Sequence, residues 1–323
     1  MDLNKKVFIA GGGGFIGTRL ANQLNQNGWD VTVLDYFWFG DYLNDGIRKQ
    51  TGGIFDLTLD SFKEEDYHAV VFLAGLSNDP MANYDPVGNF VENGASPSYL
   101  AFLAKKAGIP RFVYASSCSV YGFTDGDSMD ETSSPSPQYP YGIAKLQAES
   151  AIMMLEDETF RPISLRKGTV GGWSPRMRYD LVVNAMTKSA LTKGQITVNN
   201  PSLWRPLVDI RDVVQSYVLS IEADLSISGI FNISNKNYTV GEIAEQVQKQ
   251  LAVLGHASTI ETKHIQDVRN YKASNQKARD LLGFDPKYDI GDSVEELLQN
   301  TDLNNHDFSD KIYYNIETYK EHK

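Results

Sequence analysis

A tyrosine and a lysine four residues apart are the first candidates for chemistry in this sequence. Tyr141 and Lys145 would lie on one face of a helix, one turn apart. A free phenol has a pKa of about 10, so a tyrosine that accepts a proton near neutral pH needs that pKa lowered by roughly three units. A nearby ammonium group supplies part of this effect, and a second positive charge must supply the rest. The same spacing occurs on ordinary solvated helix surfaces, so the pair needs support from its surroundings.

Serines follow the apolar run Phe112–Ala115, which is predicted to be a buried strand. Open α/β sheets bind ligands at the carboxyl ends of their strands, where these hydroxyl groups would lie. Ser117 would hydrogen-bond the substrate hydroxyl that gives its proton to Tyr141. Two neighbours have two interpretations each: Ser116 lines the site or caps the strand end, and Cys118 is an unusual acid or a small apolar filler.

A glycine-rich turn, Gly11–Gly17, directly follows the predicted strand Val7–Ala10 and opens a helix predicted over Thr18–Asn27. Glycines permit a tight turn and let a pyrophosphate approach the backbone, and the helix N-terminus supplies free N–H groups. Asp35 ends the next predicted strand, where a carboxylate can accept hydrogen bonds from ribose hydroxyls. There is no Arg or Lys between Asp35 and Arg48 to receive a 2′-phosphate, so the sequence predicts NAD rather than NADP. The positive nicotinamide ring would then supply the second charge for Tyr141.

Strands and helices alternate through the first half of the chain, which is typical of a parallel sheet. The other predicted elements are strands at Val31–Leu34, Ala69–Leu73 and Ile163–Leu165, and helices at Ser98–Lys106 and about 142–157. The pattern predicts an α/β fold, a doubly wound parallel (Rossmann) sheet with a smaller, mixed C-terminal substrate domain. Residues 1–165 and 205–235 are assigned to the dinucleotide-binding domain, and residues 166–204 and 236–323 to the substrate domain.

The second half also carries helix signals. Thr239 and Glu242 form the sequence pattern of a capping box, and the apolar stripe of Ile243, Val247 and Leu251 follows. The polar residues after about 300 are predicted to form an arm or a lid.

Composition narrows the classes of partner. Among 323 residues, 30 Lys and Arg stand against 41 Asp and Glu, which gives a formal charge of −11. A field of this sign repels nucleic acid and anionic membrane surfaces, so neither is expected as a partner. The longest apolar run, Val70–Leu76, is far too short to cross a bilayer. One cysteine, and five histidines without metal-ligand spacing, predict no metal site, and the protein is expected to be cytoplasmic.

With these motifs in hand, the sequence resembles the extended short-chain dehydrogenase/reductase family of nucleotide-sugar epimerases and dehydratases. The resemblance runs from about Lys6 to Leu298. It rests on the glycine turn, on Ser117 with Tyr141 and Lys145, on Leu73-Ala74-Gly75, and on the segment from Trp204 to Ile210. The cofactor-binding residues that the motifs and the resemblance imply are Gly11, Gly14, Phe15, Ile16, Gly17, Asp35, Asp56, Leu57, Leu73, Ala74, Gly75, Asn93, Ser116, Tyr141 and Lys145.

The resemblance implies oxidation of a sugar hydroxyl, usually at C4, by tightly held NAD. Tyr141 would take the proton, and a 4-keto nucleotide sugar would form. The net reaction stays open between a 4-epimerase and a 4-dehydrogenase. One alternative is a dehydratase or reductase that uses Cys118, and another is a non-catalytic NAD-binding regulator, although a regulator has no need of an intact Ser117, Tyr141 and Lys145.

Departures from the family pattern bear on that choice. Dehydratases of the family typically carry Asp-Glu directly after the catalytic hydroxyl, where this chain has Cys118-Ser119. Many 4-epimerases have an asparagine at the position of Thr169, which weakens a galactose-type assignment. The segment 174–184 is similar to a branch that includes bacterial nucleotide-sugar 4-dehydrogenases.

The resemblance also implies where the substrate binds. Arg205 and Arg269 match positions that hold the diphosphate, Asn184 resembles an amide that contacts it, and Arg178 lies in the adjoining loop. Thr169 and Ser117 complete the predicted substrate residues. Because the helix that follows Tyr141 has apolar residues on more than one side, a homodimer is expected.

Overall fold

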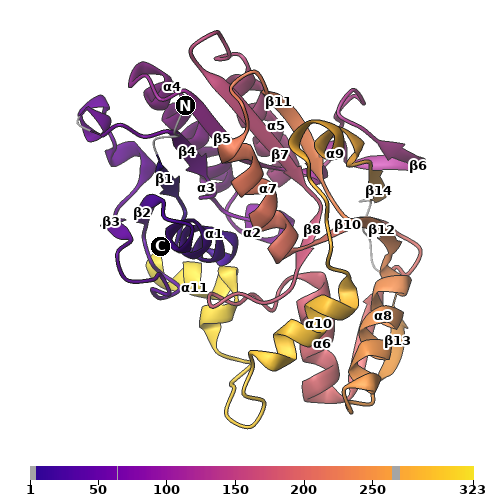
Figure 1. Cartoon of the computed structure of the whole chain (residues 1–323). Helices are drawn as coiled ribbons and strands as arrows, with labels where there is room; N and C mark the ends of the chain where they lie inside the picture. Colours follow the sequence, from indigo (N-terminus) through magenta and orange to yellow (C-terminus); the bar gives the residue numbers. More distant parts are fainter. Residues whose placement is uncertain (1–4, 64, 264–269) are drawn as a thin grey trace.

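A seven-stranded, wholly parallel sheet forms the centre of the molecule (Figure 1). The computed structural model describes residues 5–63, 65–263 and 270–323. The strands run in the order β11-β7-β5-β4-β1-β2-β3. Their bounds are β1 Lys6–Ala10, β2 Asp30–Asp35, β3 Arg48–Thr51, β4 Ala69–Phe72, β5 Arg111–Ser117, β7 Arg161–Lys167 and β11 Gly229–Ile233.

The strand order reverses beside β1, because the chain first adds β2 and β3 on one side and then returns to add β4 and β5 on the other. At such a switch point the loops after the two central strands part and leave a crevice at their carboxyl ends. The glycine turn follows β1, and Leu73-Ala74-Gly75 follows β4. The topology therefore sets two of the predicted motifs on opposite walls of one crevice.

Helices cover both faces of this sheet. On one face α1 (Phe15–Gln26) and α7 (Ile210–Glu222) bury Leu20, Leu24 and Tyr217 in the larger hydrophobic core. On the other face α4 (Ser96–Lys106) and α5 (Pro140–Met153) belong to a second core. The predicted doubly wound α/β fold is confirmed.

Three smaller sheets build the rest of the molecule. They are β8 (Thr169–Gly171), β10 (Trp204–Asp209) and β12 (Lys236–Thr239); β9 (Gln195–Asn199) with β13 (Thr259–Lys263); and β6 (Phe123–Met129) with β14 (Asn270–Ala273). Helices α6 (Val182–Lys193), α8 (Val240–Val253) and α10 (Ile290–Gln299) pack around a third core. The sequence pattern predicts that the whole segment 205–235 belongs to the dinucleotide-binding domain. In the structure this segment contains most of β10, which pairs with β8 and β12 in a small sheet, and then α7 and β11, which pack against or join the large sheet.

Short elements connect these layers. They are α2 Asp79–Tyr84, α3 Pro86–Phe90, α9 Gln276–Leu282 and α11 Asn315–His322, the 3₁₀ turns at Ile54–Asp56, Leu59–Phe62, Cys118–Tyr121 and Lys311–Tyr313, and a π-helical turn at Val91–Ala95. Beyond residue 300, where an arm or lid was expected, the chain runs back to the large sheet and ends in α11 (Figure 1).

Several boundaries differ from the sequence predictions, and two of the differences have a clear physical reason. Helix α1 begins at Phe15 rather than Thr18, because the fourth glycine of the turn is already its N-cap in extended backbone. Strand β3 was not predicted, since all four of its residues are exposed and it carries no apolar pattern. The capping box at Thr239 and Glu242 is confirmed, with the Thr239 backbone N–H donating to Glu242 Oε2 at 2.7 Å.

Candidate active site

One cavity of about 940 Å³ lies at the carboxyl ends of the large sheet, and residues of both parts of the fold line it. Its walls include the glycine turn, the loop after β4, the end of β5 and the first turns of α5 and α6. A space of this size, walled by both layers, can hold a dinucleotide and a second ligand side by side.

The glycine turn forms one wall, and its geometry requires glycine at particular positions. Gly11 has a φ of +83°, and a Cβ there would lie 2.3 Å from the Ala74 backbone nitrogen. A Cβ at Gly17 would lie 2.2 Å from the Gly11 carbonyl oxygen. At Gly14, in contrast, a Cβ would meet only that oxygen within 4 Å among the described residues, so the backbone is open to the cavity. This cradle at the N-terminus of α1 suits a pyrophosphate.

Asp35 ends β2 beside this turn. Its carboxylate accepts hydrogen bonds from the backbone N–H of Gly13 and of Phe37, both at 2.9 Å. Burial is the largest influence on the group and raises the pKa of Asp35, while the two amides counteract it. The side chain lines the cavity, as a ribose-binding carboxylate must.

The wall beyond Asp35 consists of Gly52, Gly53 and Ile54 rather than the two residues expected there. Asp56 turns its carboxylate back to accept the Gly53 backbone N–H at 2.8 Å, and so caps a short 3₁₀ turn. Leu57 is buried in the core. Neither Asp56 nor Leu57 lines the cavity, because the turn that carries them presents its preceding residues instead.

The opposite wall contains Leu73, Ala74 and Gly75. Asn93 lies behind Gly75 in the π-helical turn, fully buried, and donates to the Leu76 carbonyl at 2.7 Å. Asn93 also lines the cavity, and its Oδ1 has no hydrogen-bond partner among the described residues. A Cβ at Gly75 would lie 2.3 Å from this oxygen, so glycine permits the close packing.

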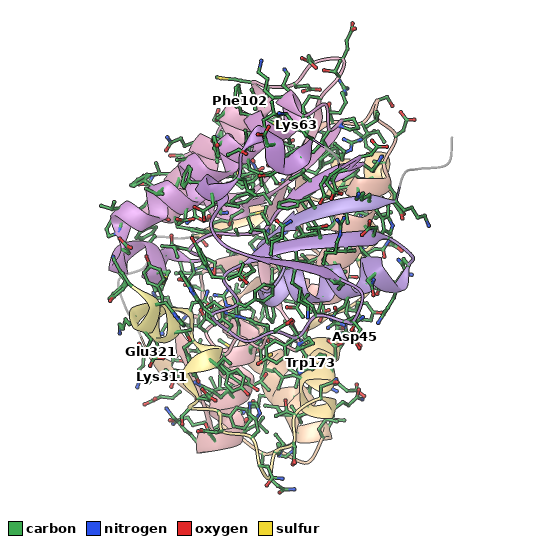
Figure 2. All side chains as sticks on the ribbon, turned by 90° about the vertical axis from the view of Figure 1, so that its left-hand side faces the viewer. Asp45, Lys63, Phe102, Trp173, Lys311 and Glu321 are labelled. Carbon is green, nitrogen blue, oxygen red and sulfur yellow. The ribbon has the colours of Figure 1, made fainter. Side chains whose placement is uncertain are left out.

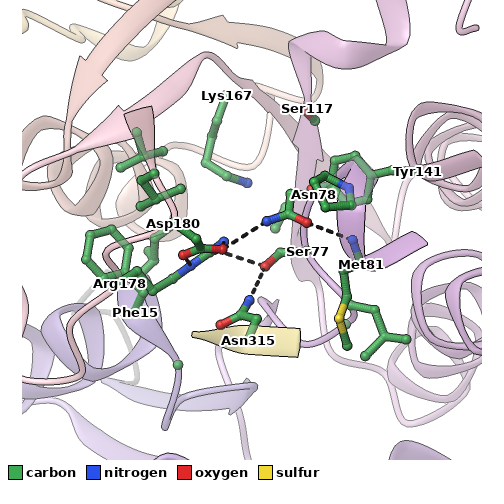
Figure 3. Close-up of a pocket in the computed structure, with 18 of the residues that line it drawn as sticks. Phe15, Ser77, Asn78, Met81, Ser117, Tyr141, Lys167, Arg178, Asp180 and Asn315 are labelled. Atoms are coloured by element: carbon green, nitrogen blue, oxygen red, sulfur yellow. Dashed lines mark hydrogen bonds and ion pairs between the residues drawn. The ribbon is translucent and has the colours of Figure 1, made fainter. Parts of the chain in front are cut away.

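Tyr141, Lys145 and Ser117 all line the cavity, and Figure 3 shows Tyr141 and Ser117 near each other on one side of it. Tyr141 lies in the first turn of α5, and Lys145 follows one turn later with its Nζ 5.7 Å from the centre of the Tyr141 ring. Ser117 ends β5 and accepts a hydrogen bond from the Ser119 hydroxyl at 2.9 Å. Ser117 also lies close enough to the Tyr141 phenol to lower its pKa.

The electrostatics of this group differ from the sequence argument. Burial raises the pKa of Tyr141 above its ordinary value, and Asp79 raises it further, although Arg178 and Ser117 lower it. Burial lowers the pKa of Lys145 to about 7. The protein alone therefore does not lower the tyrosine pKa, because both groups are desolvated. The lowering depends on further positive charge in the cavity.

A second lysine, Lys167, lies beside the triad and was not predicted. It ends β7 and donates to the Ser116 carbonyl at 3.0 Å and to the Tyr217 hydroxyl at 3.1 Å. Burial and the Lys145 charge lower its pKa. Its sequence signal is a charged residue at the carboxyl end of a predicted strand. Ser116 lines the cavity, and its hydroxyl has no hydrogen-bond partner among the described residues.

A polar network forms the floor of the cavity, and Figure 3 shows it as the dashed lines that join Ser77, Asn78, Arg178, Asp180 and Asn315. Arg178 binds Asp180 through two hydrogen bonds of 2.9 and 2.6 Å and donates to the Ser77 hydroxyl at 2.9 Å. Asn78 donates to Asp180 at 3.0 Å, and Asn315 donates to Ser77 at 2.8 Å. Arg178 was predicted from its loop, whereas no local pattern marks Asn315, which lies far away in the sequence.

The predicted substrate residues divide into three groups. Thr169, Arg178, Arg205 and Ser117 line the cavity. Asn184 does not, because its fully buried amide accepts the Gly172 N–H and donates to the Gly172 and Arg178 carbonyls, which ties the loop after β8 to α6. Arg269 lies outside the described residues.

Cys118 follows Ser117 but does not line the cavity. It is fully buried, and its thiol donates to the Arg166 carbonyl at 3.1 Å. Burial raises the pKa of this thiol to about 12. These surroundings favour the interpretation of Cys118 as a small apolar filler over its interpretation as an acid.

We therefore expect Cys118→Ala to keep at least half of the wild-type kcat/KM with whichever nucleotide sugar the protein converts. The thiol does not line the cavity, so its loss affects only packing and the hydrogen bond to the Arg166 carbonyl, with a cost of about 1 kcal/mol in the free energy of unfolding. Steady-state kinetics and thermal melting of the variant check this result. A fall of kcat by a hundredfold without a change in melting temperature would restore Cys118 as an acid.

Comparison with known proteins agrees with this geometry. Residues 7–234 match the model of the NAD dependent epimerase/dehydratase family. The UDP-glucose 4-epimerase of Lacticaseibacillus casei is 28% identical over 320 residues, which cover 91% of this chain and 96% of that protein. UDP-glucuronic acid decarboxylase 5 of Arabidopsis thaliana is 26% identical over 315 residues, with coverage of 90% and 87%. A solved structure of MoeE5 with UDP-glucuronic acid and NAD has a TM-score of 0.80 at 25% identity, and the match covers 92% of this chain and 100% of that one.

The chain belongs to the NAD-dependent epimerase/dehydratase family. It is an NAD-dependent enzyme of the nucleotide-sugar epimerase type, and NAD is its cofactor. The open backbone at Gly14, the carboxylate of Asp35 and the crevice beside β1 fit this cofactor.

Two further findings concern other classes of function. Within residues 5–63, 65–263 and 270–323, no group of three His, Cys, Asp or Glu side chains is arranged to hold a metal ion. In the same ranges, no helix combines the length and the apolar character that crossing a membrane would need.

Proposed function

We propose that this protein interconverts nucleotide-diphosphate sugars as a 4-epimerase, through a 4-keto intermediate. The observation that carries the proposal is that Tyr141 and Ser117 line one cavity together with the glycine turn on the one hand and with Arg205 and Thr169 on the other. A sugar ring bound between them would have its diphosphate towards Arg205 and its reacting hydroxyl at the phenol.

The division of labour follows from the fold. The large sheet, with the glycine turn and Asp35, would hold the cofactor, and the part built from the small sheets would hold the nucleotide sugar. When bound, NAD supplies the two-electron acceptor beside the sugar. Ser117 would bind the C4 hydroxyl and align it, Tyr141 would accept its proton, and Lys145 would orient the ribose and keep positive charge near the phenol. For the return step the 4-keto sugar would turn over in the cavity, so that C4 is reduced on its opposite face, and Tyr141 would give the proton back to the C4 oxygen.

The surroundings of Cys118 favour epimerisation over dehydration. A dehydratase needs an additional acid–base group beside the catalytic hydroxyl, and the thiol proposed for that task lies outside the cavity with its pKa raised. The relatives named UDP-glucose 4-epimerase support the same choice. A 4-dehydrogenase would release the 4-keto sugar instead of reducing it again. A direct assay of the products must distinguish this outcome from epimerisation.

The test is to incubate the purified protein with UDP-, dTDP-, GDP- and CDP-linked hexoses and to analyse the products by mass spectrometry and NMR. A C4 epimer of unchanged mass supports the proposal. A product lighter by two hydrogens would mean a 4-dehydrogenase, and loss of water a dehydratase. Absence of turnover with the whole panel, despite bound NAD, would favour a regulator.

Arg205 is proposed to bind the substrate diphosphate. Its Nη1 donates to the Trp204 carbonyl at 2.8 Å, and its guanidinium lies 5.9 Å from the centre of the Tyr271 ring at the cavity wall. We expect Arg205→Ala to raise KM for the nucleotide sugar by roughly ten- to hundredfold, because a charge-assisted hydrogen bond to phosphate is lost. Steady-state kinetics measure this, and absorbance of bound NAD should be unchanged. An unaltered KM would remove Arg205 from the site.

We also propose a cytoplasmic homodimer. The thiol of the single cysteine is buried and unpaired with any other, which suits a reducing compartment. Phe102 on α4 and Ile143 on α5 are exposed by 46% and 41%, and Figure 2 places Phe102 on the outer surface of the molecule. Helix faces of this kind can pack against a second copy. Light scattering at micromolar concentration checks the dimer, and a monomeric mass would contradict it.

A further inference from the structure

The loop between β8 and α6 carries two buried arginines with different surroundings. Arg178 is neutralised by Asp180, as described above. Arg176 is only 3% exposed, yet no carboxylate among the described residues lies within ion-pair distance of its guanidinium. Arg176 is therefore a buried cation, and no carboxylate of the described residues forms an ion pair with it.

The contacts of Arg176 hold it in place without neutralising it. Its Nη2 donates to Asn315 Oδ1 at 2.5 Å, and its guanidinium stacks over the Phe39 ring at 3.6 Å from the ring centre. Its Nη1 has a long contact of 3.5 Å with the Met177 carbonyl, and its Nε has no hydrogen-bond partner among the described residues. Neutral partners on two sides fix the orientation and leave capacity for a further acceptor.

Burying a cation costs free energy unless an anion accompanies it. Burial lowers the pKa of Arg176 to about 9 and the Arg178 charge acts in the same direction, whereas the charges of Asp180 and Asp35 raise it. Because Arg176 lines the main cavity, the missing anion can be a ligand.

The position of Arg176 indicates which ligand. Two residues before it, the Ser174 hydroxyl donates to the Phe15 carbonyl at 2.8 Å, so this loop is attached to the first turn of α1. Arg176 also feels the charge of Asp35, which ends β2 on the same side. The loop thus brings a cation to the helix N-terminus that follows the glycine turn, where the backbone at Gly14 is open to the cavity.

We propose that Arg176 is a side-chain ligand of the cofactor's pyrophosphate, held in position by Asn315 of α11. The site then binds this anion with a guanidinium in addition to the backbone N–H groups of the glycine turn. The proposal rests on NAD as the cofactor and not on which sugar reacts.

Helix α11 is fastened beside the cavity by several contacts. Asn315 reaches Ser77, and the Tyr319 hydroxyl donates to Asp85 at 2.7 Å. Trp38, three residues after Asp35, packs on Tyr319 and stacks on His322 with ring centres 5.2 Å apart. Because α11 bridges the loops after β2 and β4, it fixes the amide that orients Arg176.

The experiment measures ligand binding by calorimetry after bound nucleotide has been stripped from the protein. Arg176→Gln is expected to weaken the binding of NAD and ADP-ribose, which both contain the pyrophosphate, by roughly ten- to hundredfold. Adenosine, which lacks it, should bind as to wild type within twofold. UDP, as a probe of the substrate diphosphate, should also be unchanged.

Two further variants make the test independent of folding defects at Arg176. Asn315→Asp keeps the shape of the side chain but places a carboxylate beside the Arg176 guanidinium, where it neutralises the cation. It should weaken the binding of NAD and ADP-ribose at least tenfold. Arg279→Gln removes a charge from an exposed ion pair with Asp285 and should leave all four affinities unchanged.

Several results would overturn the proposal. Equal affinities of wild type and Arg176→Gln for NAD and ADP-ribose would make Arg176 a structural cation only. Weaker UDP binding with intact ADP-ribose binding would assign it to the nucleotide sugar. An equal loss of affinity for every ligand, adenosine included, would indicate damage to the cavity. The affinity of Asn315→Asp for NAD and ADP-ribose would then decide whether the proposal holds. A failure to find any sugar substrate would leave these binding results unaffected, so the two proposals fail separately.

Discussion

Tyr141→Phe is expected to lower kcat by roughly 10²–10⁴-fold and to leave NAD bound, because the phenol oxygen is the proposed proton acceptor and no part of the cofactor's phosphate cradle. The phenyl ring keeps the packing of α5, so the melting temperature should change little. Turnover is measured with the nucleotide sugar found in the panel, and bound NAD by absorbance after denaturation.

The pH dependence of the wild type belongs to the same test. Because burial raises the pKa of Tyr141, the phenol is mostly protonated at neutral pH. Its phenolate fraction then grows as the pH rises, and kcat should increase from pH 6 to pH 9. Tyr139→Phe, two residues earlier and outside the cavity lining, serves as the matched control and should retain activity. Turnover of Tyr141→Phe within tenfold of wild type would remove the tyrosine as base.

Lys145→Met is expected to lower kcat about a hundredfold and yet to stabilise the cofactor-free protein. Lys145 is 4% exposed, and burial lowers its pKa to about 7, against about 10.4 for a lysine in an unfolded chain. At pH 7 this difference corresponds to about 4 kcal/mol of unfolding free energy, which an apolar side chain of similar length recovers. Urea denaturation of wild type and variant measures it.

The sign of the pH dependence follows from the lowered pKa. Between about pH 7 and pH 10.4 the unfolded chain binds more protons at this lysine than the folded protein does, so wild-type stability rises with pH there. The advantage of Lys145→Met is therefore largest at and below pH 7 and disappears towards pH 10. The exposed Lys106 on α4 is the control, and Lys106→Met should show no such trend. A variant less stable than wild type at pH 6 would contradict the prediction.

Local patterns determined much of this protein in advance. Five strands of the large sheet, β1, β2, β4, β5 and β7, contain apolar runs that a sequence pattern marks. The glycine turn, Asp35, Leu73-Ala74-Gly75 and the Tyr141–Lys145 spacing are short motifs whose geometry is local. Because a parallel sheet aligns the carboxyl ends of its strands, these motifs must converge once the sheet forms. The cofactor class and the catalytic triad were predicted on that basis, and the role of the triad stays a prediction.

Tertiary structure alone decided the rest. Cys118 and Asn184 carry polar atoms that sequence cannot orient, and both turn into the protein to satisfy backbone groups. Arg176 and Arg178 are equivalent in sequence, two residues apart, but Asp180 neutralises one of them, while Asn315, brought across the molecule by α11, holds the other. The pKa values of Tyr141 and Lys145 likewise depend on burial. Side-chain orientation, charge balance and desolvation are properties of neighbours distant in the chain, so no local pattern records them.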